Sequence, residues 1–548
     1  MFPFAIGGTE QGSPRSVLER QALATKYARI ILASNAPPFH LEKLQKDFPM
    51  IQQIQKGQED DHISTGLLNH VSHLNRKRQR QLEPNESFWW LVTAVEPVIK
   101  SNENNVWVFH VTPSESNLTA KETYKLTSEN DPKLSAIENT KILKSQNLVL
   151  IDIERFDAFY KGMSNNILWP AFHNILYKVD VKNEDFDTNL EGMLLLSFIV
   201  CWEYLREIES KNAKGPLERT TRHSKNDKKS LVNAKEPLKL GFFLHTPFEL
   251  TKDFVEKFEN FEKKFKNLTE EIIKGMLSFD KVGFQTNKDR DIFVKWAEYF
   301  YEENVQKTKE NTIINLKIEN ITPKNGCNLG VYPATIKIND FTSIAEKDEI
   351  INEAKKLKDE KMANTLGEGK LFFGVERFDY TKGIKEKLVA FEKYLDEHPD
   401  RVGRDVFYQI AQNNRSGIDK YGKEIDYKAI IFETEGVKRE ELIKRYLAMD
   451  IGVVTPVMDG MNLVAKEMIV CNPNASLILS EGAGTHHQFT ENKLSHNYHV
   501  VQDIEDAEAF AQVMHEAVTQ PKKVAELSEY LKENGVEKWS NEFLYGKK

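Results

Sequence analysis

This chain of 548 residues has few cysteines, no net positive charge and no long apolar run. Its three cysteines, Cys201, Cys327 and Cys471, are widely spaced and form no metal-ligand pattern. We therefore expect free, buried thiols and a reducing compartment. The formal net charge of -8 argues against nucleic acid as the main partner, so any phosphate site must be a local basic cluster.

Membrane and export signals are equally scarce. The strongest apolar run, Met193 to Trp202, is about half as long as a membrane span requires. The N-terminus has no basic region ahead of a long apolar run, so we expect no signal peptide. A cytoplasmic protein without a membrane partner is the expectation that follows.

The composition is that of a globular protein, with 40% hydrophobic and 29% charged residues. A chain of this length is too long for one hydrophobic core, so we expect two to four domains. Patterns typical of strands alternate with patterns typical of helices. This alternation predicts an α/β fold of doubly wound domains.

The stretch Val453–Glu467 reads V-V-T-P-V-M-D-G-M-N-L-V-A-K-E, which predicts a strand, a tight loop and a helix start. Open α/β sheets bind ligands at such a place. The first N–H groups of the helix, Met461 to Val464, would face an anion, and Gly460 would let a ligand approach the backbone. Carboxylates at Asp459 and Glu467 suit sugar hydroxyls, which together favours a nucleotide-sugar site. The alternative is an ordinary turn with Asp459 as a helix cap.

A second string, E-R-F-D-Y-T-K-G at Glu376–Gly383, follows the predicted strand Lys370 to Val375. Arg377 and Lys382 lie five apart in a loop that leaves a strand, so both charged groups can converge on one diphosphate. Fixed cations stabilise a diphosphate leaving group more as the sugar bond breaks than before. The alternative for two basic loop residues is plain solvation.

Further candidates lie in the first half of the chain. The string Leu240–Phe248 predicts a buried strand that carries His245, a residue that is commonly structural at such a place. Tyr160 and Trp169 each combine a ring with a polar group suited to a sugar, although dense aromatics are usually core. Gly66 precedes a helical pattern and would admit a phosphate or a sugar, with a plain helix start as the alternative.

These strings resemble the trehalose-6-phosphate synthases, which are retaining glycosyltransferases of the GT-B fold. The resemblance spans residues 28–544 in patches and is closest in the two strings of the second half. It implies an α/β protein with two Rossmann-like doubly wound domains facing a central cleft. The implied division is an N-terminal extension (1–27), an acceptor-side domain (28–340), a nucleotide-sugar donor domain (341–525) and a terminal helix that crosses back to the first domain (526–548).

The resemblance implies transfer of glucose from UDP-glucose to glucose 6-phosphate, forming α,α-trehalose 6-phosphate without a metal or other cofactor. It is compatible with a homo-oligomer or a trehalose-phosphatase partner. The implied catalytic residues are His245, Arg377, Lys382 and Asp459. The implied donor-binding residues are Gly66, Gly460, Met461, Asn462, Leu463, Val464 and Glu467, and the implied acceptor-binding residues are Tyr160, Trp169 and Arg415.

The departures from the family pattern lie on the acceptor side. The family's first strand ends in Ser-Asn-Arg, whose Arg binds the acceptor phosphate, whereas this chain has Ala36 in place of that Arg. The family's His-Asp-Tyr-His-Leu is replaced by Cys201–Leu205, where Glu203 alone could substitute for the carboxylate, and Gly-Gly-Leu is reduced to Thr65-Gly66-Leu67. The basic stretch Lys211–Glu236 predicts an exposed insertion.

Two alternatives therefore stay open. One is a related glycosyltransferase or pseudo-glycosyltransferase with a different acceptor. The other is a weakly active regulatory homologue that binds nucleotide sugar.

Overall fold

The computed structural model describes residues 239–250, 262–363, 365–412 and 429–545, the short segments 164–166 and 168–175, and four strands nearer the N-terminus. Contacts divide the chain into two compact units. The first comprises Met1–Leu244, Leu250–Phe284 and Asp291–Gly330. The second comprises Val331–Lys548 together with two short loops from earlier in the chain, His245–Glu249 and Gln285–Arg290.

The first unit contains a mixed sheet, whose described strands follow the order β4-β3-β2-β1-β5-β6-β9-β8-β7. β2, β3 and β4 run parallel, as do β5 and β6, whereas β1 lies antiparallel between β2 and β5. The strands are β1 (Phe2–Ile6), β2 (Ile30–Ser34), β3 (Val106–Val111), β4 (Leu148–Leu150), β5 (Lys239–Phe243), β6 (Lys281–Phe284), β7 (Gln306–Glu310), β8 (Ile313–Lys317) and β9 (Cys327–Val331). β1 falls in the stretch expected as an extension, and the sequence analysis did not predict it.

The helices described in the first unit are α9 (Trp169–Phe172), α13 (Glu262–Leu277) and most of α14 (Asn287–Tyr301). The predicted strand Leu240–Phe248 proved too long, because β5 ends at Phe243. Pro247 has no N–H to continue the ladder, so His245 lies in the loop that follows. Several expectations concern residues outside the described ranges, namely those on Ala36, Gly66, Tyr160, Cys201–Leu205, Lys211–Glu236 and Arg415.

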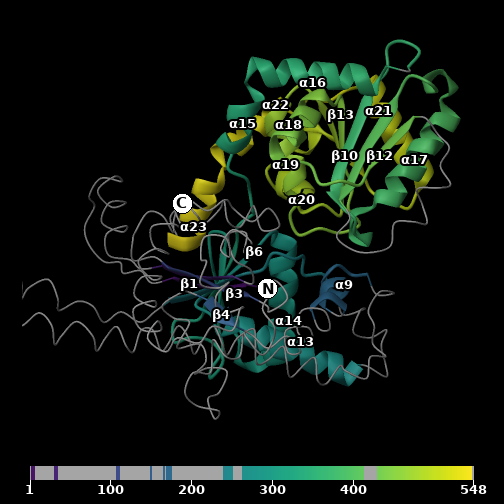
Figure 1. Cartoon of the computed structure of the whole chain (residues 1–548). Coiled ribbons are helices and arrows are strands. Elements are labelled where there is room, and N and C mark those ends of the chain that lie inside the picture. Colours follow the sequence, from purple (N-terminus) through teal and green to yellow (C-terminus); the bar gives the residue numbers. More distant parts are fainter. Residues whose placement is uncertain are drawn as a thin grey trace, which may run out of the picture. The chain divides into compact units, whose positions relative to one another are not determined.

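The second unit is a doubly wound α/β domain with a parallel six-stranded sheet (Figure 1). The order β12-β11-β10-β13-β14-β15 is the 3-2-1-4-5-6 order of Rossmann folds. Apolar runs at Lys370–Val375, Val406–Ala411, Ala429–Thr434, Gly452–Thr455 and Ala475–Ser480 predict five of these strands, whereas the three-residue β15 is too short to stand out. The strands are β10 (Leu371–Arg377), β11 (Val406–Gln412), β12 (Ile430–Glu433), β13 (Ile451–Val454), β14 (Ser476–Ser480) and β15 (His499–Val501).

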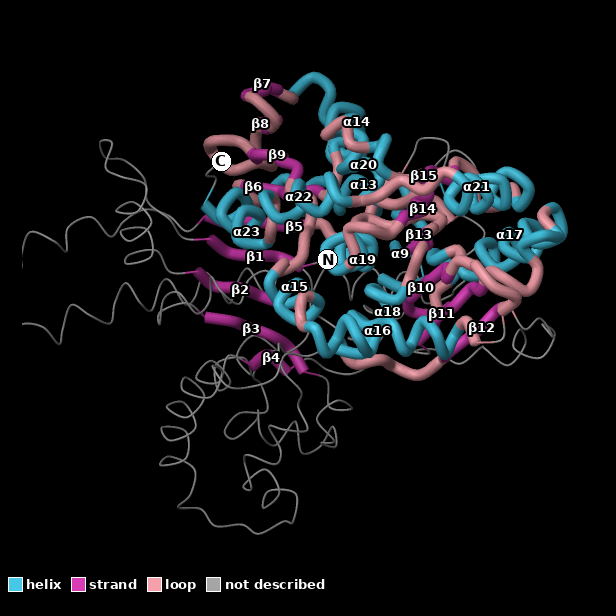
Figure 2. Tube along the Cα trace, turned by 90° about the horizontal axis from the view of Figure 1, so that it is seen from above, coloured by secondary structure: helices cyan, strands magenta, loops and turns pink. Residues whose placement is uncertain are grey.

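Helices cover both faces of this sheet (Figure 2). Apolar residues of α16, α18, α19 and α22 bury one face, and those of α17 and α21 bury the other. The helices of the unit are α15 (Asn339–Ala345), α16 (Asp348–Lys361), α17 (Ile384–Glu397), α18 (Arg439–Ala448), α19 (Leu463–Cys471), α20 (Gly484–Glu491), α21 (Ala507–Thr519), α22 (Ala525–Glu533) and α23 (Val536–Tyr545).

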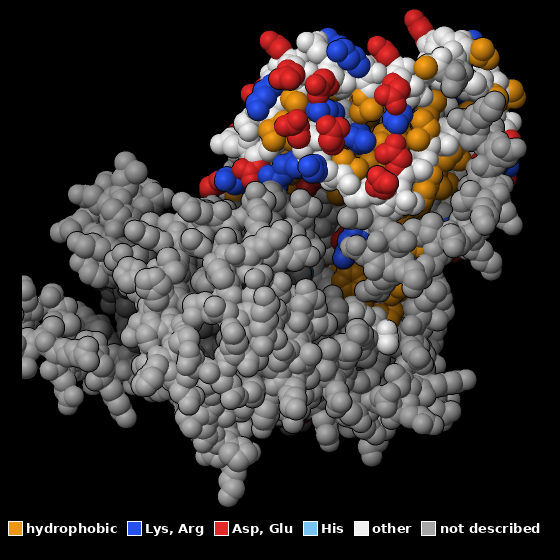
Figure 3. All heavy atoms as spheres, viewed as in Figure 1, with side chains coloured by type: hydrophobic (Ala, Val, Ile, Leu, Met, Phe, Trp, Pro, Cys, Tyr) orange, Lys and Arg blue, Asp and Glu red, His pale blue; other side chains and the backbone are white. Residues whose placement is uncertain are grey.

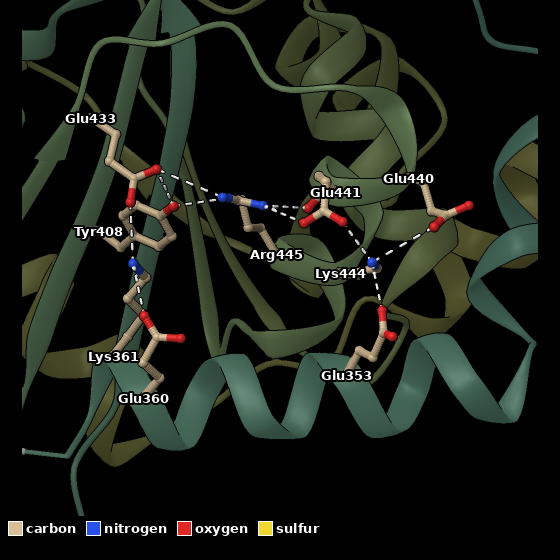
Figure 4. Close-up of polar contacts among 9 residues, drawn as sticks. All are labelled: Glu353, Glu360, Lys361, Tyr408, Glu433, Glu440, Glu441, Lys444 and Arg445. Carbon is tan, nitrogen blue, oxygen red and sulfur yellow. Dashed lines mark hydrogen bonds and ion pairs between the residues drawn. The ribbon is translucent and has the colours of Figure 1, made fainter.

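The outer surface beside α16 and α18 carries a network of polar contacts (Figure 4). Arg445 donates to the Tyr408 hydroxyl at 2.8 Å, and that hydroxyl donates to Glu433 at 2.6 Å. Lys444 pairs with Glu353 and with Glu441 on its own helix. Half-exposed pairs of this kind contribute up to about 1 kcal/mol each. The face of the unit seen in Figure 3 likewise intersperses both signs of charge.

Two further expectations concern the thiols and the membrane. Cys327 and Cys471 are free and buried, as predicted, and Cys201 lies outside the described residues. In the ranges that the structure describes, every helix is too short or too polar for a membrane span.

Candidate functional site

The strand order of the second unit reverses between β10 and β13. In a doubly wound sheet the connections from two such strands lead to opposite faces, and ligands bind in the crevice outside their carboxyl ends. The loops that leave β10 and β13 contain the two strings singled out in the sequence. The sheet topology thus brings together two segments that lie about eighty residues apart in the chain, so a switch-point site is the first candidate.

The loop after β10 is shaped by Asp379 and Gly383. Asp379 accepts a hydrogen bond from the N–H of Thr381 at 3.0 Å and caps the short 3-10 helix Tyr380–Lys382. Gly383 then adopts φ 63°, and a Cβ there would come within 2.2 Å of the Thr455 carbonyl oxygen. Only glycine fits this turn, which fixes the backbone directly after Lys382.

The loops after β10 and β13 meet in an ion pair. Lys382 Nζ lies 2.6 Å from Asp459 Oδ2, and the two side chains are only 11% and 16% exposed. A backbone hydrogen bond from Val457 N–H to the Thr381 carbonyl, 2.8 Å long, ties the loops together. Lys382 and Asp459 were expected in one site from the sequence, but not as a direct pair. Arg377 is the exposed last residue of β10 and makes no ion pair with any described residue.

The main chain around Asp459 is held by the loop after β14. Asp459 donates its N–H to the Gly482 carbonyl at 2.8 Å, and its own carbonyl accepts from Gly484 N–H at 2.9 Å. A Cβ on Gly484 would lie 1.9 Å from the Gly460 carbonyl oxygen, and a Cβ on Gly460 would lie 2.2 Å from the His245 carbonyl oxygen. Backbone therefore packs directly on backbone, and the loop has one narrowly defined position.

Helix α19 begins where this loop ends. Asn462 is its cap, because Oδ1 accepts the N–H of Ala465 at 3.1 Å while Nδ2 donates to Asp459 at 3.4 Å. The alternative interpretation of Asp459 as the helix cap is therefore wrong. The N–H groups of Leu463 and Val464 lie in the first turn, where no intrahelical acceptor exists. They form the positive end of the helix dipole, which favours an anion.

Glu467 lies half-buried in the second turn of α19. Its Oε2 accepts a hydrogen bond from the Tyr446 hydroxyl of α18 at 2.8 Å. Burial raises the pKa of Glu467 to about 7, while the Tyr446 hydrogen bond and the charge of Arg439 oppose the rise. Tyr446 is not a candidate from the sequence, since it lies 21 residues from Glu467 in an ordinary helical pattern.

A buried ion pair supports the loop after β10 from below. Lys387 Nζ of α17 lies 2.6 Å from Glu376 Oε1, with exposed fractions of 0% and 4%. Gln409 donates to the other carboxylate oxygen at 2.6 Å. This pair anchors the end of β10 beside Arg377. Lys387 is not a candidate from the sequence, because a lysine in an amphipathic helix is usually exposed.

His245 belongs to one of the short loops that the second unit takes from earlier in the chain. Burial lowers the pKa of His245 well below its ordinary value, so the imidazole is neutral at physiological pH. Its carbonyl oxygen faces Gly460 and accepts a hydrogen bond from Gln285 at 3.4 Å. The structure thus brings His245 next to the loop of Asp459.

Trp169 is the one acceptor candidate within the described residues. It starts α9 in the first unit, is half-buried, and accepts a hydrogen bond from His173 Nδ1 on its carbonyl at 2.6 Å. Tyr160, Arg415 and the donor candidate Gly66 lie outside the described ranges. Across the side chains that are described, no group of three or more His, Cys, Asp or Glu residues is arranged to hold a metal ion.

Comparison with known proteins identifies a family and relatives of which this chain matches only a part. The family profile "Glycosyltransferase family 20" matches residues 228–546, which is more than half of the chain. The Caenorhabditis elegans protein named alpha,alpha-trehalose-phosphate synthase [UDP-forming] 1 is 33% identical over 540 residues, covering 86% of this chain and 40% of that protein. The chain spans less than half the length of the first curated relatives that it matches.

Solved structures show the same fold. A trehalose-6-phosphate enzyme from E. coli, bound with UDP-2-fluoro glucose, matches with a TM-score of 0.59 at 21% identity, covering 83% of this chain and 95% of that one. The UDP-forming alpha,alpha-trehalose-phosphate synthase from Burkholderia xenovorans in complex with glucose-6-phosphate matches with a TM-score of 0.54 at 22% identity, covering 73% and 86%.

These matches confirm the predicted GT-B class with its Rossmann-like α/β domains. Together with the profile match, they show that the chain belongs to glycosyltransferase family 20, the trehalose-6-phosphate synthase family.

Proposed function

We propose that this chain transfers glucose from UDP-glucose to the anomeric hydroxyl of glucose 6-phosphate, with retention, and forms α,α-trehalose 6-phosphate. The observation that carries the proposal is the Lys382–Asp459 pair, which unites the two family-like loops at the switch point of the Rossmann sheet. The names of the curated relatives and the ligands of the two solved structures agree with it. UDP-glucose and glucose 6-phosphate are thus the proposed small-molecule partners.

Lys382 and Arg377 hold the donor diphosphate in this proposal. The diphosphate gathers negative charge as the bond to glucose breaks, and cations fixed in advance stabilise that charge without reorganisation. Lys382 is held in place by Asp459, and Arg377 is exposed at the end of a strand that a buried ion pair anchors. The first N–H groups of α19 add a further positive end.

Asp459 and the backbone of Gly460, Met461 and Asn462 bind the glucosyl group, and His245 assists them. A neutral imidazole can both donate and accept a hydrogen bond, which suits a sugar hydroxyl. Glu467 accepts hydrogen bonds from the hydroxyls of the ribose. Its carboxylate already accepts from Tyr446 and keeps lone pairs for a second donor.

The reaction proceeds on one face of the sugar. The bond between the anomeric carbon and the β-phosphate oxygen breaks, and the acceptor hydroxyl oxygen forms its bond to that carbon from the same side. The leaving phosphate takes the proton of the acceptor hydroxyl, and UDP departs. Arg377 and Lys382 supply the charge stabilisation, so the step as proposed needs neither a metal nor another cofactor.

The acceptor side consists of Trp169 together with Tyr160 and Arg415, as the resemblance implies. Because Ala36 and Cys201–Leu205 depart from the family pattern there, the experiment that tests the proposal varies the acceptor. UDP release is measured with UDP-glucose alone and with glucose 6-phosphate, glucose or a cyclitol phosphate added. The expected result is release only with glucose 6-phosphate and a product that is trehalose 6-phosphate.

Lys382→Met is the matched active-site variant, and Lys385→Met, three residues on at an exposed position, is its control. We expect the turnover of Lys382→Met to fall by about two to three orders of magnitude, as for loss of one preorganised charge stabiliser, with Lys385→Met unchanged. UDP release with another acceptor would contradict glucose 6-phosphate as the substrate, although the chain would still be a glycosyltransferase. Binding of UDP-glucose without release for any acceptor would contradict the enzyme proposal in favour of a regulatory homologue.

For location and macromolecular partners we propose a cytoplasmic enzyme that either self-associates or works beside a phosphatase that consumes its product. Sparse cysteine supports a reducing compartment. Light scattering of the purified chain decides whether self-association occurs. A monomeric mass at micromolar concentration would leave only the phosphatase arrangement.

A further inference from the structure

Lys466 is a completely buried lysine whose ammonium group is bound by a backbone carbonyl. Its Nζ donates to the Ala334 oxygen at 2.5 Å, and the side chain is 0% exposed. Within the described part of the chain it has no ion-pair partner, and burial lowers its pKa to about 7. A buried amine without a counter-charge costs folding free energy that a Met or Leu at this position would not.

Gln285 binds the N–H of Ala334, the residue whose carbonyl binds Lys466. Its Oε1 accepts the N–H of Ala334 at 2.8 Å, and its Nε2 donates to the His245 carbonyl at 3.4 Å. Gln285 is 2% exposed, so neither bond competes with bulk water. Ala334 is therefore held at its N–H by one buried side chain and at its carbonyl by another.

These contacts close a ring. It passes from Lys466 on α19 to Ala334, then to Gln285, then to the carbonyl of His245. That carbonyl lies against Gly460, where a Cβ would be only 2.2 Å away, and Gly460 leads back into the start of α19. A closed ring of contacts among buried groups restrains the distance between His245 and the Gly460 backbone, because a shift of one member strains the contacts of its neighbours.

We propose that Gln285 and Lys466 are positioning residues for the glucosyl part of the donor. They hold Ala334 between them and so set the spacing of His245 and Gly460. The inference rests on the proposed function, in which those two residues face the donor sugar. Arg377 and Lys382, which hold the diphosphate in that proposal, and Glu467, which binds the ribose, are not members of the ring, so a defect in the ring should affect the sugar and spare the nucleotide.

The test compares the affinities of UDP-glucose and UDP by titration calorimetry for the wild type, Gln285→Leu and Lys466→Met. For both variants we expect the dissociation constant of UDP to stay within twofold. The advantage of UDP-glucose over UDP should fall by about tenfold or more, and kcat should fall more than KM changes. An unchanged affinity ratio with unchanged kcat would overturn the proposal.

Gln488→Leu is the control, since Gln488 is also a buried glutamine of the second unit and donates to Tyr530 at 3.4 Å, outside the ring. It should lose similar stability without losing the affinity ratio; the same loss of ratio in this control would mean a merely structural effect and would overturn the proposal. If Gln285→Leu does not fold, Gln285→Glu replaces it. That variant keeps the acceptor for Ala334 but turns an oxygen toward the His245 carbonyl, so the ratio should still fall.

The two proposals fail in different ways. A wild type that binds UDP-glucose more tightly than UDP, yet forms no trehalose 6-phosphate, contradicts the proposed acceptor. In that case the positioning role is still decided by the UDP-glucose and UDP affinities of the variants. A wild type that binds both ligands equally has no sugar subsite of this kind, which overturns the positioning role.

Discussion

Lys382 has a counter-ion within the protein, Asp459, and this pairing shapes what the residue can do. Its ammonium group is held 2.6 Å from Asp459, at low exposure, instead of sampling solvent. A lysine side chain loses much rotamer freedom when it is held in one position, and the pair with Asp459 already restricts Lys382 in this way. An arriving diphosphate thus meets a cation already in position.

Gly460 allows a sharper statement about the backbone at the same place. In Gly460→Ala the new Cβ would meet the His245 carbonyl at 2.2 Å and the Pro247 nitrogen at 3.0 Å, both main-chain atoms that cannot rotate away. We expect a loss of stability of about 2 kcal/mol from overpacking, together with loss of donor-dependent UDP release. Urea denaturation and the release assay measure the two effects.

Gly535→Ala is the control for that substitution, since the nearest atom to its Cβ is the end of a flexible Glu537 side chain at 3.3 Å. It should change neither stability nor activity appreciably. Full activity of Gly460→Ala would show that the backbone contact with His245 is dispensable.

Glu467 predicts a pH dependence of donor binding. Its pKa of about 7 means that the carboxylate is roughly one tenth ionised at pH 6 and nine tenths at pH 8. The ionised form accepts ribose hydroxyls, so the affinity for UDP-glucose should rise about tenfold from pH 6 to pH 8. His245 stays neutral over this range, because burial keeps its pKa low. Calorimetric titration at several pH values measures the slope.

Glu467→Gln removes this carboxylate and should bind UDP-glucose weakly, with a smaller change in affinity between the two pH values than the wild type; Lys466, whose pKa is also about 7, still titrates in the variant. A wild-type affinity that is flat with pH, or that falls as the pH rises, would contradict the assignment of Glu467 to the ribose.

At the scale of elements, α23 ties the end of the chain to the start of the second unit. Trp539 donates its Nε1–H to the Tyr332 carbonyl at 2.9 Å, and Phe543 packs edge-on against the Tyr332 ring. Trp539→Ala should cost roughly 3 to 5 kcal/mol and lower the melting temperature by about 10 °C, since the indole is 4% exposed. Calorimetry measures it, with the neighbouring exposed Lys538→Ala as control; equal melting temperatures would contradict a structural role for this helix.

The elements also show how far the sequence could reach. Apolar runs such as the one that includes Val453–Val454 predict the central parallel strands, because strands that are buried on both faces consist of consecutive hydrophobic residues. The Lys382 and Asp459 loops were found because unusual residue combinations follow those strands. Gln285 and Lys466 could not be found, since what distinguishes them is burial and a partner at Ala334, neither of which any local pattern records. The β1 strand was missed because Gly7 and Gly8 beside it indicated irregular structure.

At the scale of the whole molecule, the second unit is not one continuous piece of chain. It incorporates His245–Glu249 and Gln285–Arg290 from ahead of Val331. Phe248 N–H and Thr286 both bind Asp289, and Gln285 binds Ala334, so the loops are held by each other and by the unit. A fragment of residues 331–548 should therefore melt at a lower temperature than a fragment of residues 239–548. Equal melting temperatures in a thermal shift assay would contradict this arrangement.

That interleaving has a consequence for recombination between relatives. A chimera with its crossover at residue 331 would combine the donor-binding unit of one parent with two foreign loops, and with them a foreign His245 and Gln285. The mismatch would fall within the ring that includes Gly460 and would not be visible at the junction itself. A crossover ahead of Lys239 takes His245–Glu249, Gln285–Arg290 and Val331–Lys548 from the same parent. Donor specificity should therefore be exchanged by a crossover ahead of Lys239 and not by one at residue 331.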